Sequence, residues 1–201
     1  MSVQGFKMIS WVAGWMLCAV FAHADHQMAM TAIVQRSEAN YTAPDVKLVR
    51  DDGKTVSLPA ELNDGRPVLL NFIYTSCTTI CPMSSQVFEQ FQERLGTRQP
   101  VHLVSISIDP EQDTPARLRA YAQQFHAAPG WNHYTGTAAA TSAVQRAFNA
   151  YRGDKMSHTA LTLARAAPGK PWIRMEGFAS VEDLLAERLL WSDEVAAAHA
   201  R

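Results

Sequence analysis

Two cysteines, Cys77 and Cys81, are the residues of this sequence best suited to carry chemistry. They are separated by three residues and stand between an apolar run and a segment with helical spacing. The free N–H groups and the dipole at a helix start favour the thiolate, which attacks disulfides and binds soft metals. A bridge between residues so close in sequence closes too short a loop to stabilise a fold. We therefore predict reactive sulfurs that form a disulfide, hold a metal or do both in turn; two inert buried cysteines are the alternative.

A metal site at these sulfurs would need a further ligand. Zinc normally takes four Cys, His or carboxylate ligands, whereas two thiolates and one imidazole suit copper. His158 begins an alternating apolar segment that we expect to lie beside the strand leading to Cys77, which makes it a candidate ligand. A solvated or capping histidine is the alternative. The candidates beyond residue 24 are His26, His102, His126, His133, His158 and His199.

A second group of soft ligands lies near the N-terminus. His26, Met28 and Met30 place one imidazole and two thioethers in five residues. Thioethers bind Cu(I), so an auxiliary copper-collecting motif is one hypothesis. Ordinary residues of a loosely held leader are the other.

Three acidic residues, Asp109, Glu111 and Asp113, follow an apolar run. They could contact a metal or a partner as a second site. We favour a turn that ends a strand, with Thr114 capping the next helix and Pro115 at its first position.

The N-terminal residues have the pattern of a secretory signal peptide. Lys7 precedes the uncharged run 8–22, and Ala22-His23-Ala24 forms a small-x-small cleavage site. An uncleaved anchor is the alternative, although a span normally needs about 20 apolar residues. We predict a signal over 1–24, a loosely held leader over 25–40 and one domain over 41–201. Cys18 would leave with the signal, and the domain would be periplasmic, where disulfides can form.

The composition and patterning indicate one α/β domain. The 201 residues are 47% hydrophobic with a formal charge of −1, and the sequence has no basic stripe of the kind that binds nucleic acid. The strand and helix signals alternate and end in a hairpin, which predicts a thioredoxin-like mixed sheet flanked by helices. An Asp-Gly turn predicts an N-terminal β-hairpin. The predicted strands are 45–50, 55–58, 67–74, 101–108, 131–136, 158–164 and 171–175, and the predicted helices are 82–95, 115–125, 138–151 and 181–190.

The sequence resembles the Sco/SenC copper proteins from about Tyr41 to Leu190. The resemblance rests on three segments: Tyr74-Thr75-Ser76-Cys77-Thr78-Thr79-Ile80-Cys81-Pro82, Ser105-Ile106-Ser107-Ile108-Asp109-Pro110-Glu111-Gln112-Asp113-Thr114-Pro115 and His158-Thr159.

The resemblance implies a thioredoxin-like fold and copper held by Cys77, Cys81 and His158. It also implies a role in assembling the CuA centre of cytochrome c oxidase subunit II, with other periplasmic copper chaperones or thioredoxin-like reductants as further partners. The residue before the family histidine is commonly Asp, whereas this chain has Ser157, which should weaken Cu(II) relative to Cu(I). Family members are often tethered to the membrane, and the short apolar run here leaves cleavage or tethering open.

Three classes of function compete for these cysteines. A peroxiredoxin-type peroxidase is excluded, because Leu70 and Tyr74 stand where it expects Pro and Thr. A thiol-disulfide oxidoreductase that keeps the subunit II cysteines reduced is the alternative, although such enzymes more often have two residues between the cysteines. We predict a copper metallochaperone rather than an enzyme.

Overall fold

The computed structural model describes residues 34–96 and 101–199, within the unit Ala32–Arg201. The predicted signal over 1–24 and the motif of His26, Met28 and Met30 lie outside the described residues. Within the described ranges, no helix is both long and apolar enough to cross a membrane.

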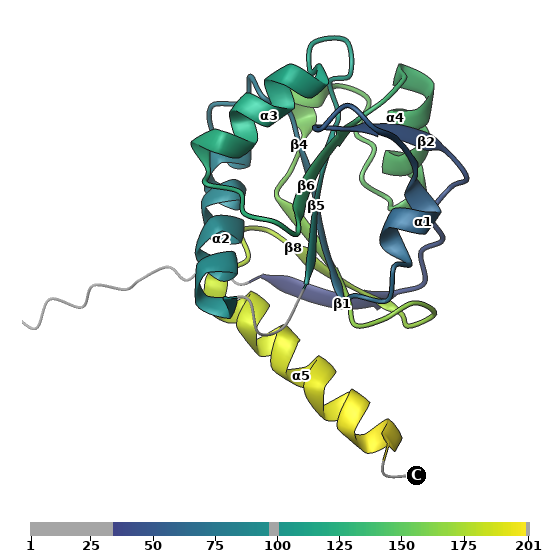
Figure 1. The fold of residues 1–201 in the computed structure, drawn as a ribbon, viewed down its shortest axis with the longest axis vertical. Helices are drawn as coiled ribbons and strands as arrows, with labels where there is room; N and C mark the ends of the chain where they lie inside the picture. Colours follow the sequence, from purple (N-terminus) through teal and green to yellow (C-terminus); the bar gives the residue numbers. More distant parts are fainter. Residues whose placement is uncertain (1–33, 97–100, 200–201) are drawn as a thin grey trace, which may run out of the picture. The chain divides into compact units, whose positions relative to one another are not determined.

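One mixed sheet of eight strands forms the centre of this unit, in the order β1-β8-β7-β4-β5-β6-β2-β3 (Figure 1). The neighbours β4, β5 and β6 run parallel, and the other pairs are antiparallel. This confirms the predicted mixed sheet and the β2–β3 hairpin. The strands are β1 Gln35–Ala39, β2 Lys47–Arg50, β3 Thr55–Ser57, β4 Val68–Ile73, β5 His102–Ser107, β6 Trp131–Thr135, β7 Leu161–Arg165 and β8 Trp172–Glu176.

Helices cover both faces of the sheet because its central strand is apolar on both sides. In β4, Leu69 and Ile73 pack with Phe88 of α2, whereas Leu70 and Phe72 pack in a second core. A strand buried on both faces has the continuous apolar run seen in the sequence. In Figure 1, α2 and α3 lie on one side of the sheet, and α1 and α4 lie on the other. The helices are α1 Leu58–Leu62, α2 Ile80–Leu95, α3 Pro115–Gln124, α4 Ala138–Ala147 and α5 Val181–His199, with a 3₁₀ turn η1 at Lys155–Ser157.

Several segments differ from the predictions. The leader prediction over 25–40 is wrong for Gln35–Ala39, because these residues pair with β8; their side chains lack an apolar alternation since β1 is an edge strand. Helix α4 ends at Ala147 rather than Tyr151, because Asn149 adopts a positive φ of 50°. Strand β7 begins at Leu161, so His158 lies before it rather than in it.

Asp113 ties together the two loops that follow β4 and β5. Its fully buried carboxylate accepts hydrogen bonds from the Thr75 backbone N–H at 3.1 Å, the Thr75 hydroxyl at 2.5 Å and the Ser107 hydroxyl at 2.6 Å. The predicted cap is confirmed, since the Thr114 hydroxyl accepts from the Arg117 N–H. Asp113 therefore holds the segment that leads to Cys77.

We expect Asp113→Ala to lower the free energy of unfolding by about 2 kcal/mol or more, because three donors lose a charged acceptor in a buried place. Urea unfolding of the purified protein measures this loss. The matched control is Glu111→Ala, an exposed acid of the same loop, which should change stability by no more than about 0.5 kcal/mol. Equal stability of the two variants would contradict the assigned role of Asp113.

Candidate metal centre

Cys77 lies in the turn before α2, and its sulfur takes the place of a helix cap. The N-cap residue Thr79 makes no side-chain hydrogen bond to the helix. Instead, the Cys81 backbone N–H donates to the Cys77 Sγ at 3.4 Å. A second backbone bond, from the Cys77 N–H to the Tyr74 carbonyl at 3.1 Å, closes the turn. Pro82 is compatible with the first turn because its missing N–H would have had no helical partner.

The pKa values of the two thiols are shifted in opposite directions. Burial acts to raise the pKa of Cys77, but donation from the Cys81 and Thr79 backbone N–H groups outweighs it and lowers the pKa to about 7. Burial raises the pKa of Cys81 far above its ordinary value, and the neighbouring Cys77 sulfur adds to the rise. Cys77 is 7% exposed and Cys81 is fully buried, and both are free thiols. At neutral pH the pair therefore consists of one readily ionised sulfur and one protonated sulfur.

Tyr74 stands beside the Cys77 sulfur and the candidate histidine. Burial, followed by a hydrogen bond to Cys77, raises the pKa of the Tyr74 hydroxyl to about 12. Its ring meets the His158 ring edge-on, with 6.4 Å between centroids. The phenol thus remains a hydrogen-bond donor at all moderate pH values.

His158 follows the η1 turn and is half-buried. Burial lowers its pKa, Arg152 lowers it further, and a hydrogen bond to the Phe72 backbone opposes them. The imidazole is therefore neutral at pH 7, which is the form that binds metals. Because β7 runs antiparallel to β4, with Asn71 opposite Thr162, the segment before β7 lies at the same end of the sheet as the cysteines.

The described residues include no group of three or more His, Cys, Asp or Glu side chains arranged to hold a metal ion. The structure brings Cys77 and Cys81 together and places the His158 ring against that of Tyr74. Two of the other histidines are buried in the sheet, where His102 bonds to the Glu61 carbonyl and His133 stacks on Trp131.

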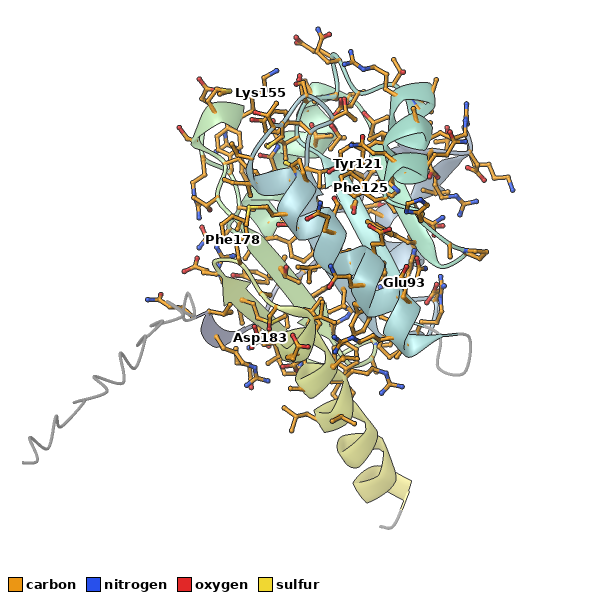
Figure 2. All side chains as sticks on the ribbon, turned by 90° about the vertical axis from the view of Figure 1, so that its left-hand side faces the viewer. Glu93, Tyr121, Phe125, Lys155, Phe178 and Asp183 are labelled. Atoms are coloured by element: carbon orange, nitrogen blue, oxygen red, sulfur yellow. The ribbon has the colours of Figure 1, made fainter. Side chains whose placement is uncertain are left out.

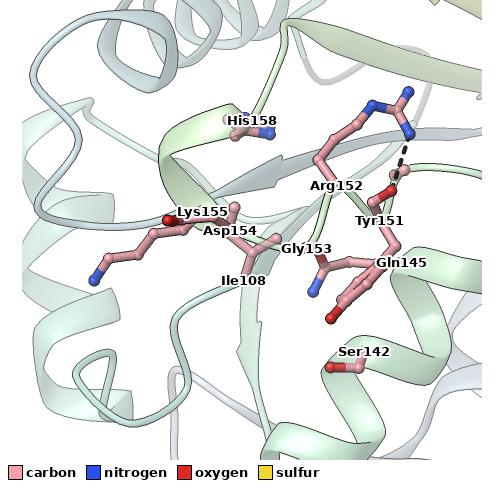
Figure 3. Close-up of a pocket in the computed structure, with 10 residues that line it drawn as sticks. Ile108, Ser142, Gln145, Tyr151, Arg152, Gly153, Asp154, Lys155 and His158 are labelled. Carbon is pink, nitrogen blue, oxygen red and sulfur yellow. Dashed lines mark hydrogen bonds between the residues drawn. The ribbon is translucent and has the colours of Figure 1, made fainter.

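A small polar pocket adjoins His158 (Figure 3). Arg152 lines it and donates to the Tyr151 carbonyl at 3.1 Å. Lys155 reaches away from the pocket in this view and bonds to Asp109 at 2.5 Å. In Figure 2, Lys155 is labelled near the top of the view, and Glu93, near the C-terminal end of α2, lies below it. The Lys155–Asp109 pair therefore links the segment of His158 to the loop after β5.

The contacts that Tyr74, Asp113 and Lys155 make with other loops were not predicted from the sequence. Tyr74 and Asp113 stood in the segments that carry the family resemblance, but their contacts are made across the fold rather than along the chain. The pairing of Lys155 with Asp109 likewise depends on how two loops are arranged in the fold.

Comparisons with known proteins identify related chains. The SCO1/SenC family model matches residues 34–180. A SCO1 protein homolog of Bacillus subtilis is 34% identical over 99 residues, which are 48% of this chain and 50% of that protein. The chain thus matches about half the length of this relative.

Two solved structures share the fold at 26% identity. Bradyrhizobium japonicum ScoI with copper bound gives a TM-score of 0.61, covering 73% of this chain and 96% of that chain. BsSco, described as having a disulfide switch and as a member of the Sco family of cytochrome c oxidase assembly proteins, gives 0.65, covering 78% and 96%. With the family model spanning most of the described residues, this chain belongs to the SCO1/SenC family.

Proposed function

We propose that this chain binds one copper ion through Cys77, Cys81 and His158 and assists assembly of the CuA centre in subunit II of cytochrome c oxidase. The observation that carries the proposal is the pair of adjacent free thiols at the start of α2, one of them with a lowered pKa. Family membership and the copper-bound relative support the choice of metal.

The donor set fits copper better than zinc. Thiolates are soft ligands that select Cu(I), and two thiolates with an imidazole also suit Cu(II). Cys77 is readily ionised, and binding at Cys81 must release its proton, since metals bind the thiolate. His158 contacts the ring of Tyr74 and lies in a connecting segment before β7, so copper binding would require a movement of this segment rather than of a strand.

Transfer would proceed by ligand exchange. A three-ligand site leaves copper open to attack by cysteine and histidine ligands of the acceptor, so ligands can be replaced one at a time. Cys81 is fully buried and Cys77 is slightly exposed, so the acceptor would meet the Cys77 side first. The N-terminal pattern described above supports a periplasmic location, either released or tethered to the membrane.

Thiol-disulfide exchange is the second candidate, favoured by the unequal acidities of the cysteines. The Cys77 thiolate would attack a disulfide of subunit II and release one of its sulfurs as a thiol. Cys81, after losing its proton, would then attack the mixed disulfide. The products are a Cys77–Cys81 disulfide and a reduced subunit II, and a thioredoxin-like reductant would restore the pair.

We expect the reduced protein to bind one copper ion tightly under anaerobic conditions, as measured by absorption and bound-metal analysis. Cys77→Ser/Cys81→Ser should abolish tight binding, because it removes both thiolates. His158→Ala should weaken binding by about tenfold or more, the size of effect expected when a supporting group of a metal site is lost.

The matched control for the histidine is His126→Ala, whose side chain is 78% exposed and bonds to Glu89. Unchanged copper affinity in His158→Ala would remove His158 from the ligand set. Failure of a fully reduced protein to bind copper would leave thiol-disulfide exchange as the better account.

The thiol acidities give a separate pH prediction. In Cys81→Ser, alkylation of Cys77 by iodoacetamide should reach half its maximal rate near pH 7, since the pKa of Cys77 is about 7 and the thiolate forms as pH rises. In Cys77→Ser, Cys81 should stay unreactive across this range, because burial raises its pKa. Quenched alkylation followed by mass spectrometry measures both rates. Similar pH profiles for the two thiols would contradict the difference in their pKa values.

A further inference from the structure

Met156 is an exposed methionine next to the candidate metal centre. Its residue is 74% exposed, the highest value among the large hydrophobic residues that the structure describes as exposed. Its Sδ lies 3.8 Å from the Tyr74 hydroxyl. Singly exposed apolar side chains are common on protein surfaces, so the feature that distinguishes Met156 is its contact with Tyr74.

The backbone around Met156 is fixed. The Asp154 carboxylate accepts from the Met156 N–H at 2.9 Å, and the Ser157 N–H donates to the Asp154 carbonyl at 3.0 Å. Lys155 anchors the same turn to Asp109. The turn thus presents the thioether beside Tyr74 while the flexible side chain stays free to move.

Tyr74 is the common neighbour of three candidate ligands. Its hydroxyl interacts with the Cys77 sulfur and contacts the Met156 sulfur, and its ring contacts His158. The flexible Met156 side chain therefore shares Tyr74 as a neighbour with both Cys77 and His158, which brings a thioether to the vicinity of a metal ion held at Cys77.

We propose that the Met156 thioether is an additional Cu(I) ligand, which makes the site of Cys77 and Cys81 selective for Cu(I) over Cu(II). This inference rests on the proposed copper-binding function. A thioether is a soft ligand that adds to the stability of Cu(I) and little to that of Cu(II). Met156 would also be the first protein sulfur that arriving Cu(I) meets, since Cys77 is nearly buried and Cys81 fully so.

The test uses Met156→Leu, which keeps the size and apolar character of the exposed side chain. Competition with a chromogenic Cu(I) chelator should show Cu(I) affinity lowered by about tenfold, as for loss of a supporting group at a metal site. Cu(II) affinity should change by less than about twofold. Met83→Leu is the matched control, because Met83 is also exposed, at 50%.

A direct readout separates ligation from a structural role. In protein labelled with ¹³C at the methionine methyl groups, anaerobic Cu(I) should shift the Met156 methyl resonance and leave that of Met83 unchanged. Normal Cu(I) binding with no Met156 shift and no loss in Met156→Leu would overturn the inference while the proposed function stands. Failure of the unmodified protein to bind Cu(I) would overturn both.

Discussion

The Cys77 sulfur acts as the cap of α2, and the rest of the candidate centre depends on this contact. With no side-chain bond from Thr79, the N–H groups at the helix start turn to the sulfur. The same contact fixes the turn after β4, begins the helix and stabilises negative charge on Cys77. Structure and reactivity are therefore two results of one arrangement.

The sheet fixes the position of the turn that contains Cys77. Strand β4 is buried on both faces and paired on both edges, so its end is held in one register. Asp113 then joins the turn after β4 to the loop after β5. Since Cys77 and Cys81 are themselves members of the core beneath α2, displacement of the sulfurs would disturb packing as well as chemistry.

Much of the fold and the cysteine pair could be predicted from the sequence, because the signals for them are local. The apolar run of β4, the Asp-Gly turn of the first hairpin and the Thr114-Pro115 helix start act over a few residues, and the sequence contains the whole signal. The two cysteines were predictable for the same reason. Strand β1 was not, because an exposed edge strand is held by backbone hydrogen bonds and needs no apolar pattern. The contacts of Tyr74, Asp113 and Lys155 join distant loops, and no local pattern encodes such pairings.

His158 lies before β7, so the position of its imidazole can change without a change in the β4–β7 register. The β4–β7 register is set by pairs from Val68 with Arg165 to Asn71 with Thr162, all beyond the His158 segment. Insertions or deletions between Asn149 and Ala160 would change the reach of the imidazole and leave this register intact. Evolution can therefore change the metal-binding properties of the site by altering the length of this one segment, without disturbing the strand pairing of the sheet.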